Sequence, residues 1–212
     1  MYKNYIFDLD GTILDTLEDL ANAVNFALGK MNYPVRTLDE VRRFIGNGVV
    51  KLIERSIPEG TGETEREKTL ALFSEYYLAH LADFTKPYDG IPEMLNTLKE
   101  NGCRLAVVSN KTDEAAKAVV KICFGDCFDI VLGKSDSFPA KPDPASVLYV
   151  METLEAEKCD TIYIGDSDVD VLTAHNAGLK CIGVTWGNRT KAELENAGAE
   201  FIADSAEDIL EK

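Results

Sequence analysis

The feature of this sequence that most constrains its fold is a series of short apolar runs separated by segments of helix length. The runs lie at residues 5–10, 104–110, 128–133, 161–166, 181–186 and 200–204. Each is rich in Val, Ile and aromatic residues with little polar alternation, which is typical of strands covered on both faces in a parallel sheet. Acidic residues open several intervening segments and glycine closes them, as at Gly102 and Gly178, which favours helices. The sequence therefore predicts an α/β fold: a Rossmann-like parallel sheet with helices on both faces.

The long stretch after the first run interrupts this alternation. Between Asp15 and residue 84 the sequence has no run of strand type, only helical patterns separated by the glycine-bearing segments FIGNGVV and PEGTGE. A first strand cannot fold without its neighbours, which come only after Pro87, so the helical block must be inserted into the α/β domain. We expect a core of residues 1–14 and 85–212, and an all-helical cap domain of residues 15–84 on two hinge-like linkers.

Composition restricts the classes of partner. The chain has 212 residues, of which 37 are acidic and 22 basic, for a net charge of -15. Such a charge disfavours binding to nucleic acid or to an anionic membrane. The apolar runs are too short to span a bilayer and the N-terminus does not resemble a signal peptide, so we expect a cytoplasmic protein. The sequence does not discriminate between a monomer and a dimer.

Polar residues follow four of the predicted elements at the points where these elements end. Ligands of open parallel sheets bind at the carboxyl ends of the strands, so these residues should converge. Two acids two positions apart repel each other unless a cation joins them. The sequence therefore predicts a cation-containing site built from Asp8, Asp10, Ser109, Asn110, Lys141 and Asp166.

These residues, in this order, resemble the motifs of the haloacid dehalogenase superfamily. The segment DLDGT matches its first motif, Ser109 its second, Lys141 before Pro142 its third, and GDSDVD its acidic fourth. The resemblance covers the whole chain, because the helical block falls where the family inserts its cap. In the cap, the GNG segment at residues 46–48 is similar to phosphoglycolate-phosphatase-like members.

The resemblance implies a Mg²⁺-dependent phosphatase with an aspartyl-phosphate intermediate. Asp8 would be the nucleophile, and Asp10 would protonate the leaving alcohol and then activate water. Carboxylates of Asp8 and Asp166 with the backbone carbonyl of Asp10 would bind Mg²⁺, which prefers oxygen ligands. Lys141 would contact both Asp8 and the transferring phosphate. Asp170, one helical turn after Asp166, would hold Lys141 or a metal-bound water.

Further residues are candidates for binding the phosphate and the rest of the substrate. The Ser109 hydroxyl and the backbone amides of Gly11 and Asn110 could point at phosphate oxygens. Candidates for contacts with the leaving group are Lys111, Gly46 and Gly48, with Arg43 and Lys51 as weaker ones.

The sequence indicates the substrate less clearly than it indicates the type of reaction. A small phosphorylated metabolite is expected, with phosphoglycolate the first to try. Four alternatives stay open: a β-phosphoglucomutase-like phosphomutase, an inorganic pyrophosphatase, a non-catalytic phosphometabolite-binding protein and a dehalogenase. Gly-Thr in place of the usual Gly-Val after the second aspartate disfavours the mutase, and the acidic fourth motif disfavours the dehalogenase.

Overall fold

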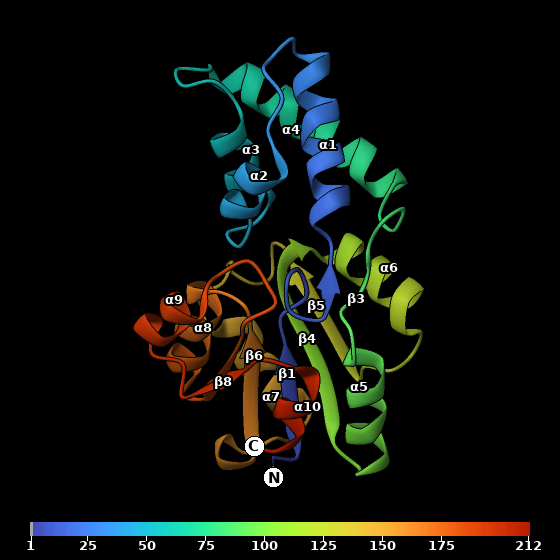
Figure 1. Ribbon diagram of the computed structural model, residues 1–212, viewed down its shortest axis with the longest axis vertical. Coiled ribbons are helices and arrows are strands. Elements are labelled where there is room, and N and C mark those ends of the chain that lie inside the picture. The colour runs from blue at the N-terminus through green and yellow to red at the C-terminus, as the bar shows by residue number, and fades with distance from the viewer. Residues whose placement is uncertain (1) are drawn as a thin grey trace.

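The computed structural model describes residues 2–212 and contains a parallel sheet with helices on both faces (Figure 1). The sheet order is β5-β4-β1-β6-β7-β8, and neighbouring strands are parallel throughout. The α/β prediction is confirmed, and each of the six apolar runs overlaps one strand. These strands are β1 (Asn4–Phe7), β4 (Arg104–Thr112), β5 (Ile130–Lys134), β6 (Thr161–Gly165), β7 (Lys180–Val184) and β8 (Phe201–Ala203).

The helices of the core form two layers, one on each face of the sheet. One layer holds α5 (Ile91–Glu100), α6 (Asp113–Phe124) and α10 (Ala206–Leu210); the other holds α7 (Ala145–Thr153), α8 (Asp168–Ala177) and α9 (Lys191–Ala197). A short 3-10 helix, Lys158–Asp160, precedes β6. In β1, Tyr5 and Phe7 pack under the first layer and Ile6 under the second. Because both faces are covered, these three successive residues are all apolar.

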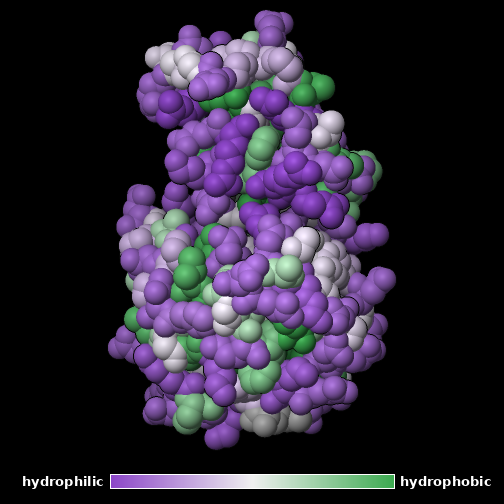
Figure 2. Space-filling view, turned by 60° about the vertical axis from the view of Figure 1, so that its left-hand side comes forward, coloured by the Kyte–Doolittle hydropathy of each residue, from purple (hydrophilic) through white to green (hydrophobic). Residues whose placement is uncertain are grey.

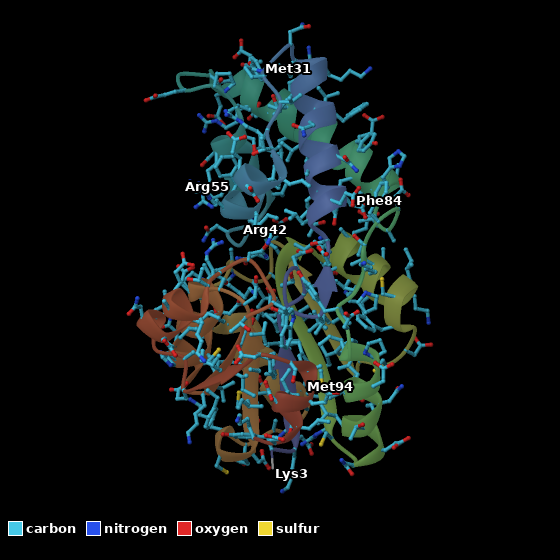
Figure 3. The ribbon with its side chains drawn as sticks, viewed as in Figure 1. Lys3, Met31, Arg42, Arg55, Phe84 and Met94 are labelled. Atoms are coloured by element: carbon cyan, nitrogen blue, oxygen red, sulfur yellow. The ribbon has the colours of Figure 1, made fainter. Side chains whose placement is uncertain are left out.

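A group of four helices lies beyond the carboxyl ends of the strands, away from both chain termini (Figure 1). They are α1 (Leu17–Lys30), α2 (Leu38–Phe44), α3 (Val49–Ser56) and α4 (Glu63–Ala79). This cap has its own apolar core, which includes Val24, Ile53 and Phe73, and Ala115 of α6 packs against it. The predicted helical insertion is confirmed, and its exact limits at residues 15 and 84 stay a prediction. Figure 3 shows Met31 at the outer end of the cap and Met94 in the core.

The two chain crossings between cap and core pair with each other. β2 (Leu14–Asp15) and β3 (Lys86–Pro87) form a two-stranded antiparallel sheet. Next to it, the buried carboxylate of Asp19 accepts hydrogen bonds from the Thr85 amide at 2.8 Å and the Thr85 hydroxyl at 2.7 Å. The sequence predicted two hinge-like linkers here and no strand. Two residues are too few to give an apolar pattern, and only the proximity of the crossings creates the pairing.

The surface is in keeping with the high negative charge. The face shown in Figure 2 is mostly hydrophilic, with hydrophobic residues scattered over it, and it narrows between the cap and the sheet domain. Within residues 2–212, no helix combines the length and apolar character that a bilayer crossing requires.

Candidate active site

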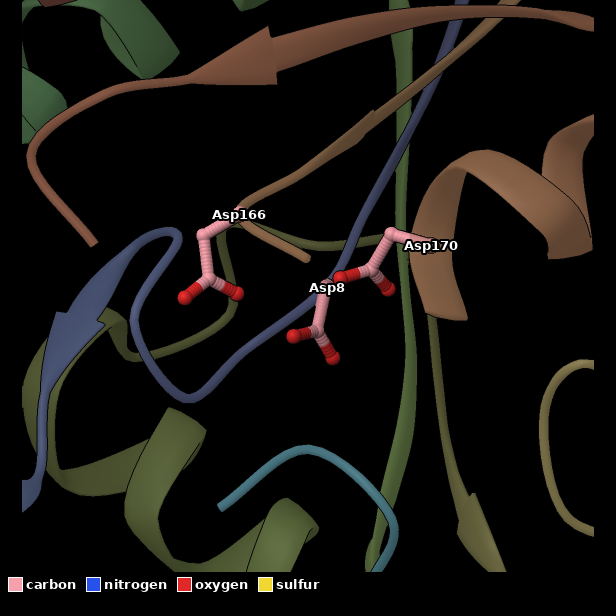
Figure 4. Close-up of side chains that lie close together, drawn as sticks. All are labelled: Asp8, Asp166 and Asp170. Atoms are coloured by element: carbon pink, nitrogen blue, oxygen red, sulfur yellow. The ribbon is translucent and has the colours of Figure 1, made fainter. Parts of the chain in front are cut away.

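Three buried carboxylates converge where β1 and β6 end. Asp8 follows β1, Asp166 follows β6, and Asp170 lies in the first turn of α8. One carboxylate oxygen from each lies within 4.8 Å of the others, and Figure 4 shows the three side chains close together, with the Asp170 carboxylate directed toward Asp8. They meet because β1 and β6 are neighbours in register, with the Asp8 amide donating to the Ile164 carbonyl at 2.8 Å.

The pKa values of these acids show a surplus of buried negative charge. Burial raises the pKa of Asp8 well above its ordinary value, the charge of Asp170 raises it further, and Lys141 opposes both. Burial and the charge of Asp170 raise the pKa of Asp166 to about 7, against hydrogen bonds from Asn188. Desolvated carboxylates near one another resist ionisation unless a cation joins them. The cluster therefore favours a bound cation beyond the lysine present.

Lys141 lies at the centre of the cluster. Its ammonium group donates to Asp8 Oδ1 at 2.6 Å, Asp170 Oδ1 at 2.7 Å, the Tyr163 hydroxyl at 3.1 Å and the Val108 carbonyl at 3.2 Å. Burial lowers the pKa of Lys141, but the carboxylates of Asp170 and Asp8 more than offset this and hold it well above the ordinary value. Lys141 is therefore a permanent cation.

Asp170 serves Lys141 and the start of its own helix. Its second oxygen accepts hydrogen bonds from the Ser167 amide at 3.2 Å and the Ser167 hydroxyl at 2.5 Å. With both oxygens engaged, Asp170 positions the lysine, which is one of the two roles that the sequence analysis considered for it.

The remaining oxygens fit a divalent metal ion. Lys141 engages only Oδ1 of Asp8, and within residues 2–212 Oδ2 is left for another partner. Asp166 Oδ2 accepts hydrogen bonds from the amide and the side chain of Asn188 at 2.7 and 2.8 Å. Among the described residues, Asp166 Oδ1 has only a 3.4 Å contact with the Thr12 hydroxyl. Two carboxylate oxygens, with the nearby Asp10 carbonyl, form the hard oxygen set that Mg²⁺ prefers. A divalent metal site at Asp8 and Asp166 is consistent with this donor set.

A glycine allows the close approach of these groups. Gly11 has φ of +93°, and a side chain there would overlap Asn188 and Asp166. Its amide donates to the Leu14 carbonyl at 2.9 Å, so a phosphate oxygen would have to share or replace that bond. Phosphate binding by Gly11 stays a prediction.

The sequence analysis did not identify Asn188, although it follows the run at residues 181–186. The rule that found Asp8, a polar residue just beyond a strand, would also have found Asn188.

Asp10 and the end of β4 form the second half of the site. Lys111 donates to Asp10 Oδ1 at 2.7 Å, and its ammonium lies 4.7 Å from the centre of the Tyr77 ring. Burial lowers the pKa of Lys111, but Asp10 and Tyr77 together more than offset the effect and raise it above its ordinary value. Ser109 Oγ accepts from the Lys111 amide at 3.2 Å. Lys111 is therefore charged and directed at the proposed acid–base residue.

The side chain of Asn110 joins the Lys141 loop to the cap. It accepts a hydrogen bond from the Lys141 amide at 2.8 Å and donates to the carbonyls of Lys141 and Gly46 at 3.3 and 3.1 Å. The sequence analysis assigned only the backbone amide of Asn110 a role, because side-chain contacts between distant loops have no local signature.

A cavity of about 190 Å³ lies between the cap and the core and reaches Asp8 and Asp10. Gly46 and Gly48 line it from the cap, as predicted candidates for substrate contacts. Among the described residues, Arg43 and Lys51 are not part of its lining, and Lys51 instead pairs with Glu54 at 2.6 Å. The core contributes Ser109, Asn110 and Lys111, and the cap adds the side chains of Leu20, Leu52, Phe73 and Tyr77.

Comparison with known proteins agrees with this geometry. The family model of haloacid dehalogenase-like hydrolases matches residues 5–184. The chain is 35% identical to phosphoglycolate phosphatase 1 of Pseudomonas aeruginosa, over 97% of this chain and 77% of that protein. It is also 35% identical to the phosphoglycolate phosphatase of Haemophilus influenzae, over 99% of this chain and 97% of that protein. A crystal structure from Lactobacillus delbrueckii subsp. bulgaricus superimposes with a TM-score of 0.94 at 34% identity, covering 99% of this chain and 97% of that one.

The chain belongs to the haloacid dehalogenase-like hydrolase family. Within that family it is a phosphatase homologous to phosphoglycolate phosphatases. The family and the enzyme class inferred from the motifs are therefore confirmed.

Proposed function

We propose that the protein is a Mg²⁺-dependent phosphatase that hydrolyses a small phosphorylated metabolite through an aspartyl phosphate on Asp8. The observation that carries this proposal is the Asp8 carboxylate, which lines the cavity with one oxygen held by Lys141 and the other left for another partner among the described residues. Phosphoglycolate is the first candidate substrate, because two relatives at 35% identity bear the name of its phosphatase.

In the first half-reaction one carboxylate oxygen of Asp8 attacks phosphorus while the bond from phosphorus to the leaving oxygen breaks, and the other Asp8 oxygen stays available to the metal ion. Lys141 keeps Oδ1 in place at 2.6 Å and balances charge that develops on the phosphoryl group. Asp10 gives its proton to the leaving oxygen. Because Lys111 engages Asp10 Oδ1, we assign that proton to Oδ2.

In the second half-reaction Asp10 Oδ2 takes a proton from water, which attacks phosphorus and restores the Asp8 carboxylate with release of phosphate. Mg²⁺, held by Asp8, Asp166 and the Asp10 carbonyl, would neutralise the negative charge shared by Asp8 and the phosphate. Ser109 and the amide of Asn110, both at the cavity, are the proposed donors to phosphate oxygens.

The test is phosphate release from p-nitrophenyl phosphate, phosphoglycolate, hexose phosphates and pyrophosphate, with Mg²⁺ and with chelator. Asp8→Asn should abolish release, because an amide is not a nucleophile of this kind, and should leave the circular dichroism spectrum unchanged. Asp168→Asn is the matched control, since the Asp168 side chain is 56% exposed and contacts Arg189 at 3.6 Å. Full activity of Asp8→Asn would remove Asp8 as the nucleophile. Conversion of a sugar phosphate to another product without release of phosphate would favour a mutase instead.

A further inference from the structure

The Tyr77 hydroxyl is a buried polar group that forms no hydrogen bond of good geometry within residues 2–212. Tyr77 lies on cap helix α4, is 4% exposed and lines the cavity. The Lys111 ammonium is a charged group that interacts with this hydroxyl and opposes the rise in its pKa. Burial raises the pKa of Tyr77 to about 12, so the hydroxyl is a neutral donor at physiological pH. Buried polar groups of folded proteins are nearly always paired, and a donor left open in a substrate cavity points to a ligand atom.

The surroundings fix the position of this hydroxyl. The ring of Tyr77 stacks on Phe73 with centroids 5.4 Å apart and an interplanar angle of 16°. On the core side, the Lys111 ammonium lies 4.7 Å from the ring centre and 2.7 Å from Asp10 Oδ1. The Tyr77 side chain from the cap and the Lys111 ammonium from the core therefore lie together beside Asp10, which we propose protonates the leaving group.

We propose that Tyr77 and Lys111 form a subsite for an anionic oxygen group, a carboxylate, on the leaving group of the substrate. This inference rests on the proposed function and adds the feature that the cap recognises. Tyr77 supplies a hydrogen bond, and Lys111 supplies charge while it remains paired with Asp10.

The location of the subsite limits the length of the leaving group. The ester oxygen must lie at Asp10 to receive its proton, and Lys111 is in direct contact with Asp10. A carboxylate at the subsite is therefore close to the ester oxygen, as in the phosphate ester of a short 2-hydroxycarboxylate.

The rest of the cap wall disfavours larger polar leaving groups. Leu20, Leu52 and Phe73 line the cavity from the cap and offer no side-chain hydrogen-bonding group, and the hydroxyl of Ser74, which also lines it, already donates to the Leu70 carbonyl at 2.9 Å. A hexose placed against them would lose water from its hydroxyls without gaining partners. The same wall tolerates the single methylene group of a glycolate ester. We therefore expect selectivity for compact anionic leaving groups over sugars.

The experiment compares two substrates of matched shape in three proteins. Phosphoglycolate and ethyl phosphate have the same two-carbon leaving group, with and without a carboxylate. Tyr77→Phe removes one oxygen and keeps the ring. Tyr76→Phe is the matched control, because Tyr76 stacks on Phe26 and His80 and is not among the residues described as lining the cavity.

Tyr77→Phe should raise the KM for phosphoglycolate by about tenfold more than the KM for ethyl phosphate, as expected for a hydrogen bond to a charged group. It should change the melting temperature of the free protein little, since the lost hydroxyl forms no hydrogen bond of good geometry within residues 2–212. Tyr76→Phe should leave the ratio of the two KM values at the wild-type value.

A binding measurement separates this inference from the proposed function. In the Asp8→Asn background, calorimetry should show phosphoglycolate binding that Tyr77→Phe weakens by about tenfold. Equal KM changes for both substrates, together with unweakened binding, would overturn the subsite and leave the phosphatase proposal standing. Absence of Mg²⁺-dependent phosphate release from both substrates would overturn the phosphatase proposal, and the calorimetric comparison would still decide on the subsite.

Discussion

Replacing Lys141 by Met tests whether the buried cation holds the charged cluster together. The Lys141 side chain is 3% exposed, and its ammonium forms four hydrogen bonds, two of them with the carboxylates of Asp8 and Asp170. Met has a similar length and no charge, so Lys141→Met leaves two buried acids facing each other. Removing one partner of a buried ion pair costs about 3–5 kcal/mol, a large share of a typical stability of about 5–15 kcal/mol.

The same substitution should reduce turnover. Lys141 lowers the raised pKa of Asp8, so its loss favours the protonated carboxyl, which is a poor nucleophile. It also removes the positive charge opposite the transferring phosphoryl group. We expect a loss of turnover on the order of 10²–10³-fold, as for other preorganised electrostatic groups.

Urea unfolding with chelator present, followed by turnover with saturating Mg²⁺, measures the two effects separately. A double variant, Lys141→Met with Asp170→Asn, removes one of the stranded charges and should recover much of the stability but none of the turnover. A double-mutant cycle with Asp170→Asn alone isolates the coupling. If Lys141→Met lowered the free energy of unfolding by less than about 1 kcal/mol, where a broken buried ion pair predicts several, the reasoning would be refuted. The reasoning would also be refuted if the double variant were no more stable than Lys141→Met alone.

Two further predictions concern the metal site. Asn188→Ala should weaken Mg²⁺ binding by about 10–100-fold, because it removes the side-chain hydrogen bond to Asp166 Oδ2. The measurement is activity as a function of Mg²⁺ concentration, and an unchanged midpoint of this titration would contradict the prediction. Because the pKa of Asp166 is about 7 in the folded protein against 3.8 for an ordinary aspartate, protons compete with the metal, and Mg²⁺ affinity should fall as pH drops below about 7. Because of the same shift, Asp166 binds a proton more tightly in the metal-free folded protein than in the unfolded chain. Protonation of Asp166 therefore contributes to the free energy of unfolding below pH 3.8, and this contribution is lost as pH rises through 7. Urea titrations across this range should show the trend in wild type and a weaker one in Asp166→Asn.

The sheet and the motif residues could be predicted because their signals are local. Each strand is covered on both faces, so its apolar run stands out, and the residues that matter chemically follow directly at the strand ends. The position of Asp8 next to Asp166 then follows from the neighbouring strands. The ends of helices could also be predicted from the sequence: Gly178, which has φ of +76°, ends α8 as expected.

The missed features depend on contacts between distant segments. The ribbon of Leu14–Asp15 with Lys86–Pro87 exists only because the crossings lie side by side. Tyr77 belongs to a helix rich in aromatic and polar residues, where one aromatic side chain cannot be distinguished from the next by pattern. Burial separates Tyr77 from the adjacent Tyr76, and burial is set by how the cap lies on the core.

The loop between α2 and α3 connects substrate recognition to the catalytic cluster. The Ile45 carbonyl accepts from Arg189 Nη2 and the Gly46 carbonyl from Asn110 Nδ2, each at 3.1 Å. Asn110 also fixes the Lys141 loop, and Arg189 directly follows the residue that holds Asp166. The cap loop is therefore bonded to both sides of the charged cluster while Gly46 lines the cavity. Because these two hydrogen bonds join the cap loop to the segments that hold Lys141 and Asp166, we expect a change in the shape of the cavity to break them or to move groups of the charged cluster.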